Sequence, residues 1–278
     1  MPLYTRNALF DELGEAPDAD AFNYIVSNNI TSLQQRAGIC NLVKFLKEQS
    51  LWTTMAGGFL FGKKVGASSG TSLPDLKGGT AATLTGGSHN SNGIFLNGNN
   101  SDEISFGART FTNNYMPSVY LLFSSYMRTG TTSSSRINFG PISSTSAYRG
   151  FQPHTHNQLG SATNIHLQCY RGDGSRYVGS QSIASFDSCG AFVGAAFSSN
   201  DQKIIGAENS RGDNATTANA VTMTFAAGAT YLLGPFESFA KASTEQTIAS
   251  ACLFWDSNTT LSINFVAELD SLIRRFVL

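Results

Sequence analysis

The sequence predicts an all-β protein, a two-sheet antiparallel sandwich that follows a helical segment and ends in a short helix. After about residue 53, glycines, serines and asparagines separate about ten short apolar runs, and turn residues lie between the runs. That spacing is typical of a sandwich rather than of βαβ units. Two amphipathic stretches, one near each end of the chain, predict helices that pack on the strands.

The first amphipathic stretch predicts a helix over about Thr31 to Trp52, with Thr31 or Ser32 as its N-cap. The acidic stretch before it, from Asp11 to Asp20, is expected to be extended or irregular. The apolar stripe recurs at three- and four-residue steps and comprises Leu33, Ala37, Cys40, Val43 and Leu46, widened by Ile39 and Leu42. Because this stripe is wider than one sheet face needs, we expect the segment before residue 59 to mediate homo-oligomerisation or docking. The alternative is a helix that covers its own sandwich.

The middle of the chain supplies most of the predicted strands. Residues 121–123 and 192–197 are apolar throughout and predict central strands, whereas Ile165, Leu167 and Cys169 alternate with polar residues and predict a half-buried strand. Val221, Met223 and Phe225 show the same alternation. The predicted strands are 93–97, 103–106, 119–123, 136–139, 165–170, 192–197, 203–206, 221–225 and 231–234.

The chain closes with a buried strand and a helix. Residues 248–255 are β-branched, small or aromatic and carry no charge, which suits a strand covered on both faces. Ser262 occupies an N-cap position. The apolar face of the following helix comprises Ile263, Val266, Leu269 and Ile273.

Three passages in this order resemble phage and prophage structural proteins with a laminin-G-like, concanavalin-type jelly-roll domain. They are Val43-Lys-Phe-Leu-Lys-Glu-Gln-Ser-Leu-Trp52 running into 55–61, Leu73-Pro-Asp-Leu-Lys-Gly-Gly-Thr80 continuing through 93–98 to 104, and the closing strand and helix. The resemblance implies an attachment segment over 1–58 and a jelly-roll sandwich with its closing helix over 59–278. It also implies a virion component.

Composition narrows the possible functions and partners. Charged residues make up 13% of the chain, about half the usual share, and the formal net charge is -1. Because Lys and Arg (18) do not outnumber Asp and Glu (19), the chain is not expected to bind nucleic acid. It contains no apolar run long enough for a membrane helix, and acidic residues near the N-terminus argue against a signal peptide. The four cysteines, Cys40, Cys169, Cys189 and Cys252, are expected to be free and buried, as in proteins made in a reducing cytoplasm.

No catalytic pattern emerges from the sequence. A glycosidase needs two carboxylates that face one groove, and no predicted strand carries acids at alternate positions. Asp102 and Glu103 are adjacent, and Glu268 and Asp270 lie on the last helix, so these carboxylates are expected to be solvated. We therefore expect no enzyme activity, no catalytic residue and no cofactor. No metal site is predicted, and a structural calcium on the loop carboxylates Asp173, Asp187, Asp201 or Asp213 stays open.

One region could bind a neutral sugar. Aromatic rings beside amide and imidazole groups can stack on the sugar ring and hydrogen-bond its hydroxyls. His154 and His156 could also share one face of a strand and bridge a metal, although Pro153 favours an exposed loop. The candidate ligand-binding residues are Tyr148, Arg149, Gln152, His154 and His156.

The sequence therefore predicts a non-enzymatic virion structural protein, a capsid decoration or tail-associated component, assembled in the host cytoplasm. Its expected partners are other virion subunits and copies of itself, with a cell-surface glycan as a further candidate. One alternative is a carbohydrate- or receptor-binding module of a tail or head fibre. A divergent polysaccharide hydrolase is the other alternative, and the missing carboxylate pair disfavours it.

Overall fold

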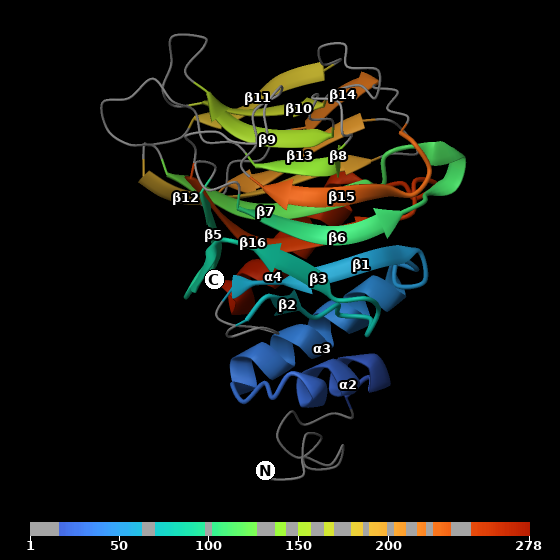
Figure 1. The fold of residues 1–278 in the computed structure, drawn as a ribbon, viewed down its shortest axis with the longest axis vertical. Coiled ribbons are helices and arrows are strands. Elements are labelled where there is room, and N and C mark those ends of the chain that lie inside the picture. The colour runs from blue at the N-terminus through green and yellow to red at the C-terminus, as the bar shows by residue number, and fades with distance from the viewer. Residues whose placement is uncertain are drawn as a thin grey trace.

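A computed structural model describes residues 17–62, 70–97, 102–126, 137–142, 150–156, 164–169, 179–185, 189–198, 203–209, 216–220, 225–234 and 246–278. Within these residues the chain forms two eight-stranded antiparallel sheets (Figure 1). The helices are α2 (Ala19–Ser27), α3 (Leu33–Glu48) and α4 (Ile263–Val277), with a 3₁₀ turn η3 (Thr112–Asn114).

The first sheet, here called the β16 sheet, has the order β14-β13-β12-β7-β16-β5-β4, and β1 also pairs with β16. Strand β16 joins the whole sheet, because its first half pairs with β5 and its second half with β1, while β7 runs along its other edge. The strands are β1 (Met55–Leu60), β4 (Ser88–Asn90), β5 (Gly93–Asn97), β7 (Ser118–Tyr126), β12 (Cys189–Ser198), β13 (Lys203–Asn209), β14 (Thr216–Ala220) and β16 (Gln246–Trp255).

The second sheet, here called the β15 sheet, has the order β11-β10-β9-β8-β15-β6-β3-β2. Its neighbours pair antiparallel throughout. The strands are β2 (Ser72–Leu73), β3 (Ala82–Thr85), β6 (Glu103–Arg109), β8 (Asn138–Ile142), β9 (Phe151–His156), β10 (Asn164–Cys169), β11 (Gly179–Ser185) and β15 (Ala229–Gly234).

The core between the two sheets is rich in phenylalanine. Phe254 of β16 stacks against Phe59 at 6.1 Å and meets Phe106 of β6 edge-on at 5.3 Å. On β7, Val119, Leu121 and Phe123 belong to this core, as strand alternation requires. This packing joins the two sheets into one sandwich.

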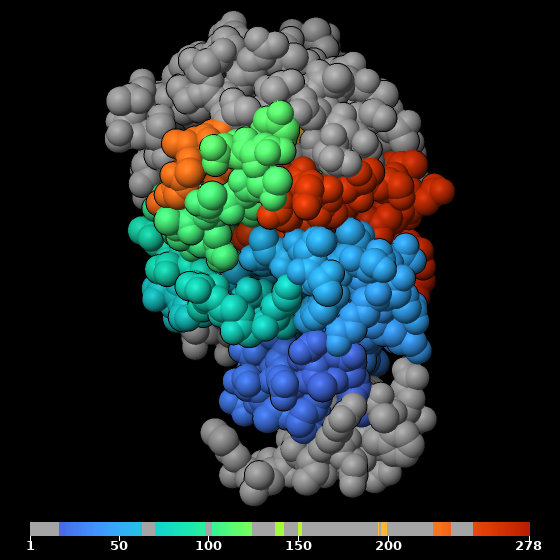
Figure 2. All heavy atoms as spheres, turned by 90° about the vertical axis from the view of Figure 1, so that its right-hand side faces the viewer, coloured from blue at the N-terminus to red at the C-terminus, as the bar shows by residue number. Residues whose placement is uncertain are grey.

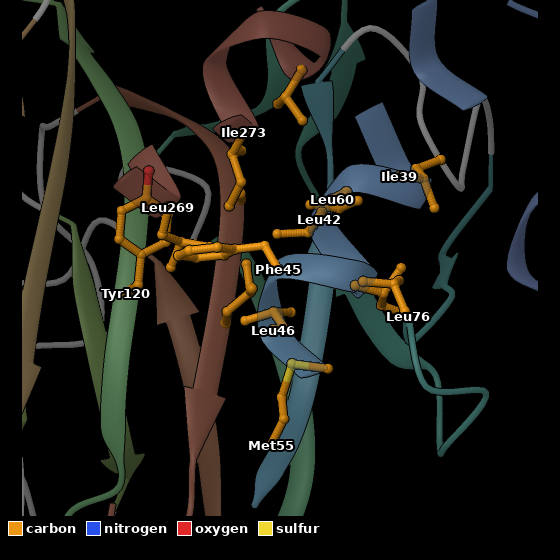
Figure 3. Close-up of a cluster of buried hydrophobic side chains, with 14 of the residues drawn as sticks. Ile39, Leu42, Phe45, Leu46, Met55, Leu60, Leu76, Tyr120, Leu269 and Ile273 are labelled. Atoms are coloured by element: carbon orange, nitrogen blue, oxygen red, sulfur yellow. The ribbon is translucent and has the colours of Figure 1, made fainter. Parts of the chain in front are cut away.

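The opposite face of the β16 sheet is covered by the helices. Tyr120 and Leu122 of β7 contribute to a second core, together with α2, α3 and α4. Figure 3 shows Leu42, Phe45 and Leu46 of α3 in one cluster with Leu60 of β1, Tyr120 of β7 and Leu269 and Ile273 of α4. The Phe45 ring stacks on that of Phe265 in α4 at 5.3 Å. Strands β7 and β16 are therefore buried on both faces, which explains their continuous apolar runs.

The predicted fold class is confirmed. The structure is a two-sheet antiparallel jelly-roll sandwich with a helical segment before it and a helix at its end. The closing helix has Ser262 as its N-cap, whose hydroxyl accepts the Phe265 amide at 3.2 Å, and Val266, Leu269 and Ile273 are fully buried. Of the predicted strands, 221–225 lies largely outside the described residues, and Phe225 itself is not in a strand.

The N-terminal predictions need correction. The structure adds α2, which begins at Ala19, so the last two residues of the lead expected to be irregular, Ala19 and Asp20, are helical, while residues 11–16 lie outside the described part. Asp18 caps this helix by accepting the Asp20 amide at 2.9 Å. The predicted domain boundary at 58/59 falls inside β1. Helix α3 does not stand apart either, because it packs on the sandwich.

The wide apolar stripe of α3 is used within the chain. Ile39 and Leu42, the residues that widen it, are 0% exposed in the helix–sheet core. The structure therefore shows the alternative arrangement, a helix that covers its own sheet, and the stripe gives no support to oligomerisation. No helix in the described ranges is long and apolar enough to cross a membrane.

Two of the four cysteines can be placed with their side chains. Cys40 on α3 and Cys252 on β16 are free and buried, as predicted. Cys169 and Cys189 lie on β10 and β12, and their side chains are outside the described part of the structure.

Candidate functional site

A pocket of about 290 Å³ lies between α2 and the loop that joins β2 to β3. Here it is called the helix–loop pocket. Figure 2 shows the helical residues at one end of the molecule, directly beside the segment that contains this loop. The lining residues are Asp20, Asn23, Tyr24, Ser27 and Asn28 on one side, and Pro74, Asp75, Leu76, Lys77, Gly78, Gly79 and Ala81 on the other.

The α2 wall is fixed to α3 by ion pairs. Lys47 of α3 lies 2.8 Å from an oxygen of Asp18 and 2.6 Å from an oxygen of Asp20. At the other end of α2, the Asn28 side-chain amide donates to the Tyr24 carbonyl at 2.8 Å, and Asn29 adopts a left-handed φ of 51° that ends the helix. These contacts fix both ends of α2 beside the pocket.

The loop wall is built around Asp75, which is only 6% exposed. Its Oδ1 accepts the backbone amides of Gly58 and Lys77, each at 3.1 Å. The Leu76 amide donates to the Gly58 carbonyl at 2.7 Å, and Leu76 enters the helix–sheet core. The loop is therefore anchored to β1 by backbone and side chain together.

The turn at the base of the loop needs glycine. The Gly78 amide donates to the Asp75 carbonyl at 2.9 Å, and Gly78 has a φ of +72°. A Cβ atom on Gly79 would lie 2.5 Å from Asp75 Oδ2. Gly79 therefore packs so closely against this carboxylate oxygen that no side chain fits between them.

Electrostatics in the pocket favour the neutral form of its buried groups. Burial raises the pKa of Asp75 above its usual range, although the amides of Lys77 and Gly58 and the positive charges of Arg109 and Lys77 act to lower it. Lys77 Nζ is held by main-chain oxygens, the Met55 carbonyl at 2.9 Å and the Thr53 carbonyl at 3.4 Å. Its ammonium also lies 5.8 Å from the centre of the Trp52 ring.

Tyr24 is the most unusual group in the pocket. Its side chain is 4% exposed, and its Oη has no hydrogen-bond partner among the described residues. Burial raises the pKa of the Tyr24 phenol, and the negative charge of Asp75 raises it further. A buried hydroxyl without a partner costs about 1–3 kcal/mol, so such groups need an explanation.

A second buried polar cluster joins α4 to the β16 sheet. Asp270 is fully buried, accepts the Tyr120 hydroxyl at 2.5 Å and pairs with Arg274 at 2.6 Å. A Cβ on Gly194 of β12 would collide with Asp270 Oδ1. Asp270 hydrogen-bonds to Tyr120 and pairs with Arg274, so the cluster fixes α4 to the β16 sheet and is not a ligand site.

Two of the carboxylates expected to be solvated are therefore buried. Besides Asp270, Asp102 is only 3% exposed, and its Oδ2 accepts the Asn97 amide at 2.9 Å. Asp102 fixes the backbone between β5 and β6. Both carboxylates were mistaken for surface groups because their partners lie on other elements of the fold.

The predicted ligand-binding residues lie elsewhere. Tyr148 and Arg149 fall outside the described residues. Gln152, His154 and His156 occupy alternate positions of β9, in register with Gln168, His166 and Asn164 of β10. The expectation of an exposed loop around Pro153 is wrong, because this segment is a strand between β8 and β10.

The helix–loop pocket was missed by sequence reasoning. Its loop, Leu73-Pro-Asp-Leu-Lys-Gly-Gly-Thr80, carries no ligand-binding pattern in the sequence, and Tyr24 lies outside the predicted helices. The available signal was Asp18 at an N-cap position with Ala21, Tyr24 and Ile25 at helical spacing behind it.

Comparisons with known proteins bear on the fold. No family model matches the chain, and no curated protein matches its sequence. Among solved structures, Trypanosoma rangeli sialidase is similar at 12% identity with a TM-score of 0.51, over 87% of this chain and 39% of the sialidase. The same sialidase in complex with the inhibitor DANA gives 12% identity and a TM-score of 0.50, over 84% of this chain and 39% of the sialidase. The botulinum neurotoxin serotype D binding domain gives 13% identity and a TM-score of 0.49, over 78% of this chain and 51% of that chain.

These comparisons correct one expectation. The prediction that the protein is not an enzyme is overturned, because solved proteins that share this fold include sialidases, which are enzymes. At 12% identity the likeness establishes the fold alone. The chain spans 39% of the length of the sialidase it matches.

Proposed function

We propose that the protein is a recognition module whose jelly-roll sandwich binds a carbohydrate in the helix–loop pocket. One observation carries the proposal. The pocket is lined by several side chains that can hydrogen-bond to sugar hydroxyls, those of Asp20, Asn23, Ser27, Asn28 and Lys77. Sugars are bound through dense hydrogen bonding to their hydroxyl groups, which such a lining can provide.

The size of the pocket limits the ligand. Its volume of about 290 Å³ lies at the lower end of the range of small-molecule sites, roughly 300–1,000 Å³. A single sugar unit at the end or branch of a glycan fits this size better than a long chain. The exposed residues Asn23 and Ser27 at the rim are then free to contact the neighbouring unit.

A glycan array probed with the full chain tests this function. We expect binding to a restricted set of glycans that share one terminal unit. Binding of that unit as a free methyl glycoside should then be measurable by calorimetry or NMR. Lack of binding to every glycan, neutral or acidic, at millimolar concentration would contradict the proposal.

A second candidate is a structural component of a phage particle that displays this module. The observation in its favour is the composition, in which charged residues make up only 13% of the chain, so its surface carries little charge repulsion against neighbouring subunits. Light scattering of the full-length protein and cosedimentation with purified particles test this role. A chain that stays monomeric at high concentration and does not bind particles would contradict it.

A further inference from the structure

The two walls of the helix–loop pocket are held by different kinds of contact. The loop wall is held by buried groups, because Asp75 accepts two backbone amides and Leu76 lies in the helix–sheet core. The N-terminal end of α2 is held by ion pairs of Lys47 with Asp18 and Asp20, whose side chains are 34%, 29% and 43% exposed. Ion pairs at this exposure contribute little and are screened by salt. The α2 wall is therefore the weaker of the two.

The apolar contact that holds α2 is also small. Only Ala21, Tyr24 and Ile25 of its nine residues are buried, whereas α3 and α4 bury seven residues each. The Tyr24 hydroxyl opposes this contact, because it is buried without a hydrogen-bond partner among the described residues. Water would satisfy the hydroxyl if α2 moved away from the sheet. Docking of α2 is thus a balance between small opposing terms.

The chain also contains a point at which a movement of α2 can end. Asn28 and Asn29 follow the helix, and Asn29 has a left-handed φ of 51°. Directly after them, Ile30 is buried and its carbonyl accepts Nε of the buried Arg36 at 2.8 Å. The residues before Ile30 can therefore open as one unit while α3 keeps its place.

We propose that α2 is a movable wall of the helix–loop pocket, held closed by the ion pairs of Lys47, and that a ligand in the pocket holds it closed as well. Asp20, Asn23, Tyr24, Ser27 and Asn28 supply one side of the lining, so the pocket is complete only while α2 is docked. A ligand that contacts both walls binds the docked state better and shifts the equilibrium toward it. The movement of α2 does not depend on the ligand, whereas closure by a sugar rests on the proposed function.

Hydrogen exchange of the full chain, measured by mass spectrometry, tests the movement. A helix of nine residues is not stable alone, so the α2 amides exchange whenever the helix undocks. In about 50 mM NaCl we expect peptides that cover residues 19–28 to exchange at least about tenfold faster than peptides of α3. In about 1 M NaCl their exchange should be about threefold faster again, because the ion pairs of Lys47 are screened.

The Lys47→Met variant tests the role of the ion pairs. It removes the charge and keeps an unbranched side chain beside Trp52, whose ring centre lies 5.5 Å from Lys47 Nζ. In about 50 mM NaCl, residues 19–28 should exchange about 3- to 10-fold faster than in the native chain, and the salt dependence should disappear. Arg275→Met is the matched control, because it removes the same charge from an exposed position on α4 and should leave α2 unchanged.

The Tyr24→Phe variant tests the cost of the buried hydroxyl. It keeps the ring in the helix–sheet core and removes the unpaired group. Exchange of residues 19–28 should become at least about threefold slower, because docking no longer leaves a hydroxyl unsatisfied. An ordinary core substitution would loosen the helix, so faster exchange in this variant would contradict the inference.

The same measurement tests closure by a ligand. The probes are the methyl glycosides of glucose, galactose, mannose and N-acetylglucosamine. A glycoside that binds in the pocket, present at about ten times its Kd, should slow exchange of residues 19–28 about tenfold, because the open state does not bind it. Peptides of α3 should exchange at their ligand-free rate.

The outcomes separate this inference from the proposed function. Exchange of α2 at the rate of α3, or exchange insensitive to both salt and Lys47→Met, would overturn the movable wall whether or not a sugar binds. A glycoside that binds without slowing α2 would overturn closure by the ligand. If α2 opens as expected and no glycan binds, the movable wall stands and the carbohydrate-binding function falls.

Discussion

At the scale of single residues, the buried carboxylates determine where the chain is rigid and where it can bind. The charge of Asp270 is paired with the Arg274 guanidinium, and its other oxygen accepts the Tyr120 hydroxyl. Asp75 accepts the Gly58 and Lys77 amides through one oxygen, and Gly79 packs against the other. The first arrangement fixes a helix, and the second fixes the loop that forms one wall of the helix–loop pocket.

Asp270→Ala should destabilise the protein by about 3–5 kcal/mol, because it leaves Arg274 without its buried partner. Chemical denaturation measures the loss. Glu268→Ala on the same helix is the control, and since Glu268 is exposed its effect should stay within about 0.5 kcal/mol. Equal effects of the two substitutions would contradict the conclusion that Asp270 fixes α4 to the β16 sheet.

Asp75 should give the stability a defined pH dependence. Its folded-state pKa lies above the unfolded value, so the folded state binds the proton more tightly. The contribution of Asp75 to the free energy of unfolding is therefore most favourable below the unfolded pKa of about 3.9 and declines as pH rises through the folded pKa. Asp75→Asn removes this term, so its stability relative to the native chain should rise from acid to neutral pH in urea denaturation. A difference that is constant with pH would contradict the shift.

At the scale of elements, sequence patterns predicted those parts that bury one continuous face. Helices α3 and α4 and strands β5, β7 and β16 were expected close to their observed positions, because their apolar residues keep one period throughout. Helix α2 was missed because it is nine residues long and follows an acidic stretch. Strands β2, β3 and β4 were missed because each has at most four residues, too few for a period.

The candidate site was harder to predict than the fold. The helix–loop pocket joins Tyr24 and Asp75, which are 51 positions apart, and only the packing of α2 against the loop brings them together. Local sequence could show that Asp75 begins a turn with Gly78. It could not show that Gly58 would hold one oxygen of Asp75, since that contact depends on the pairing of β1 with β16.

Helix α4 should depend on Leu269, which is fully buried in the helix–sheet core. Leu269→Ala should lower the free energy of unfolding by about 2–5 kcal/mol, because it removes buried surface and leaves a cavity. Leu33→Ala provides the matched control, since Leu33 is 48% exposed. A loss at Leu269 no larger than that at Leu33 would show that α4 does not dock as described.

At the scale of the whole molecule, the fold has three layers, which are the β15 sheet, the β16 sheet and the helices, and the β16 sheet is the middle layer. The β16 sheet is covered by the β15 sheet on one face and by the helices on the other, so its central strands β7 and β16 bury described residues on both faces (Figure 1). The helix–loop pocket lies at the outer edge of this arrangement, where the helical layer meets the loop between β2 and β3. A ligand can therefore bind there without opening either core.

Thiol reactivity should report this layering. Cys252 lies on β16 and is fully buried, and burial raises the pKa of its thiol well above the usual value. In the native protein Cys252 should react with a thiol reagent only through unfolding, and it should react at once in denaturant. Mass spectrometry of the labelled peptide measures this directly. Rapid native labelling of Cys252 would contradict its place between the layers.

The central claim is tested most directly by a crystal structure of the protein soaked with the neutral glycoside that binds best in solution. The account predicts a sugar in the helix–loop pocket, with its hydroxyl groups within about 2.5–3.2 Å of polar lining side chains such as Asn23, Ser27 and Asn28. A sugar bound instead at β9, beside Gln152, His154 and His156, or a pocket that stays empty at saturating glycoside, would contradict it.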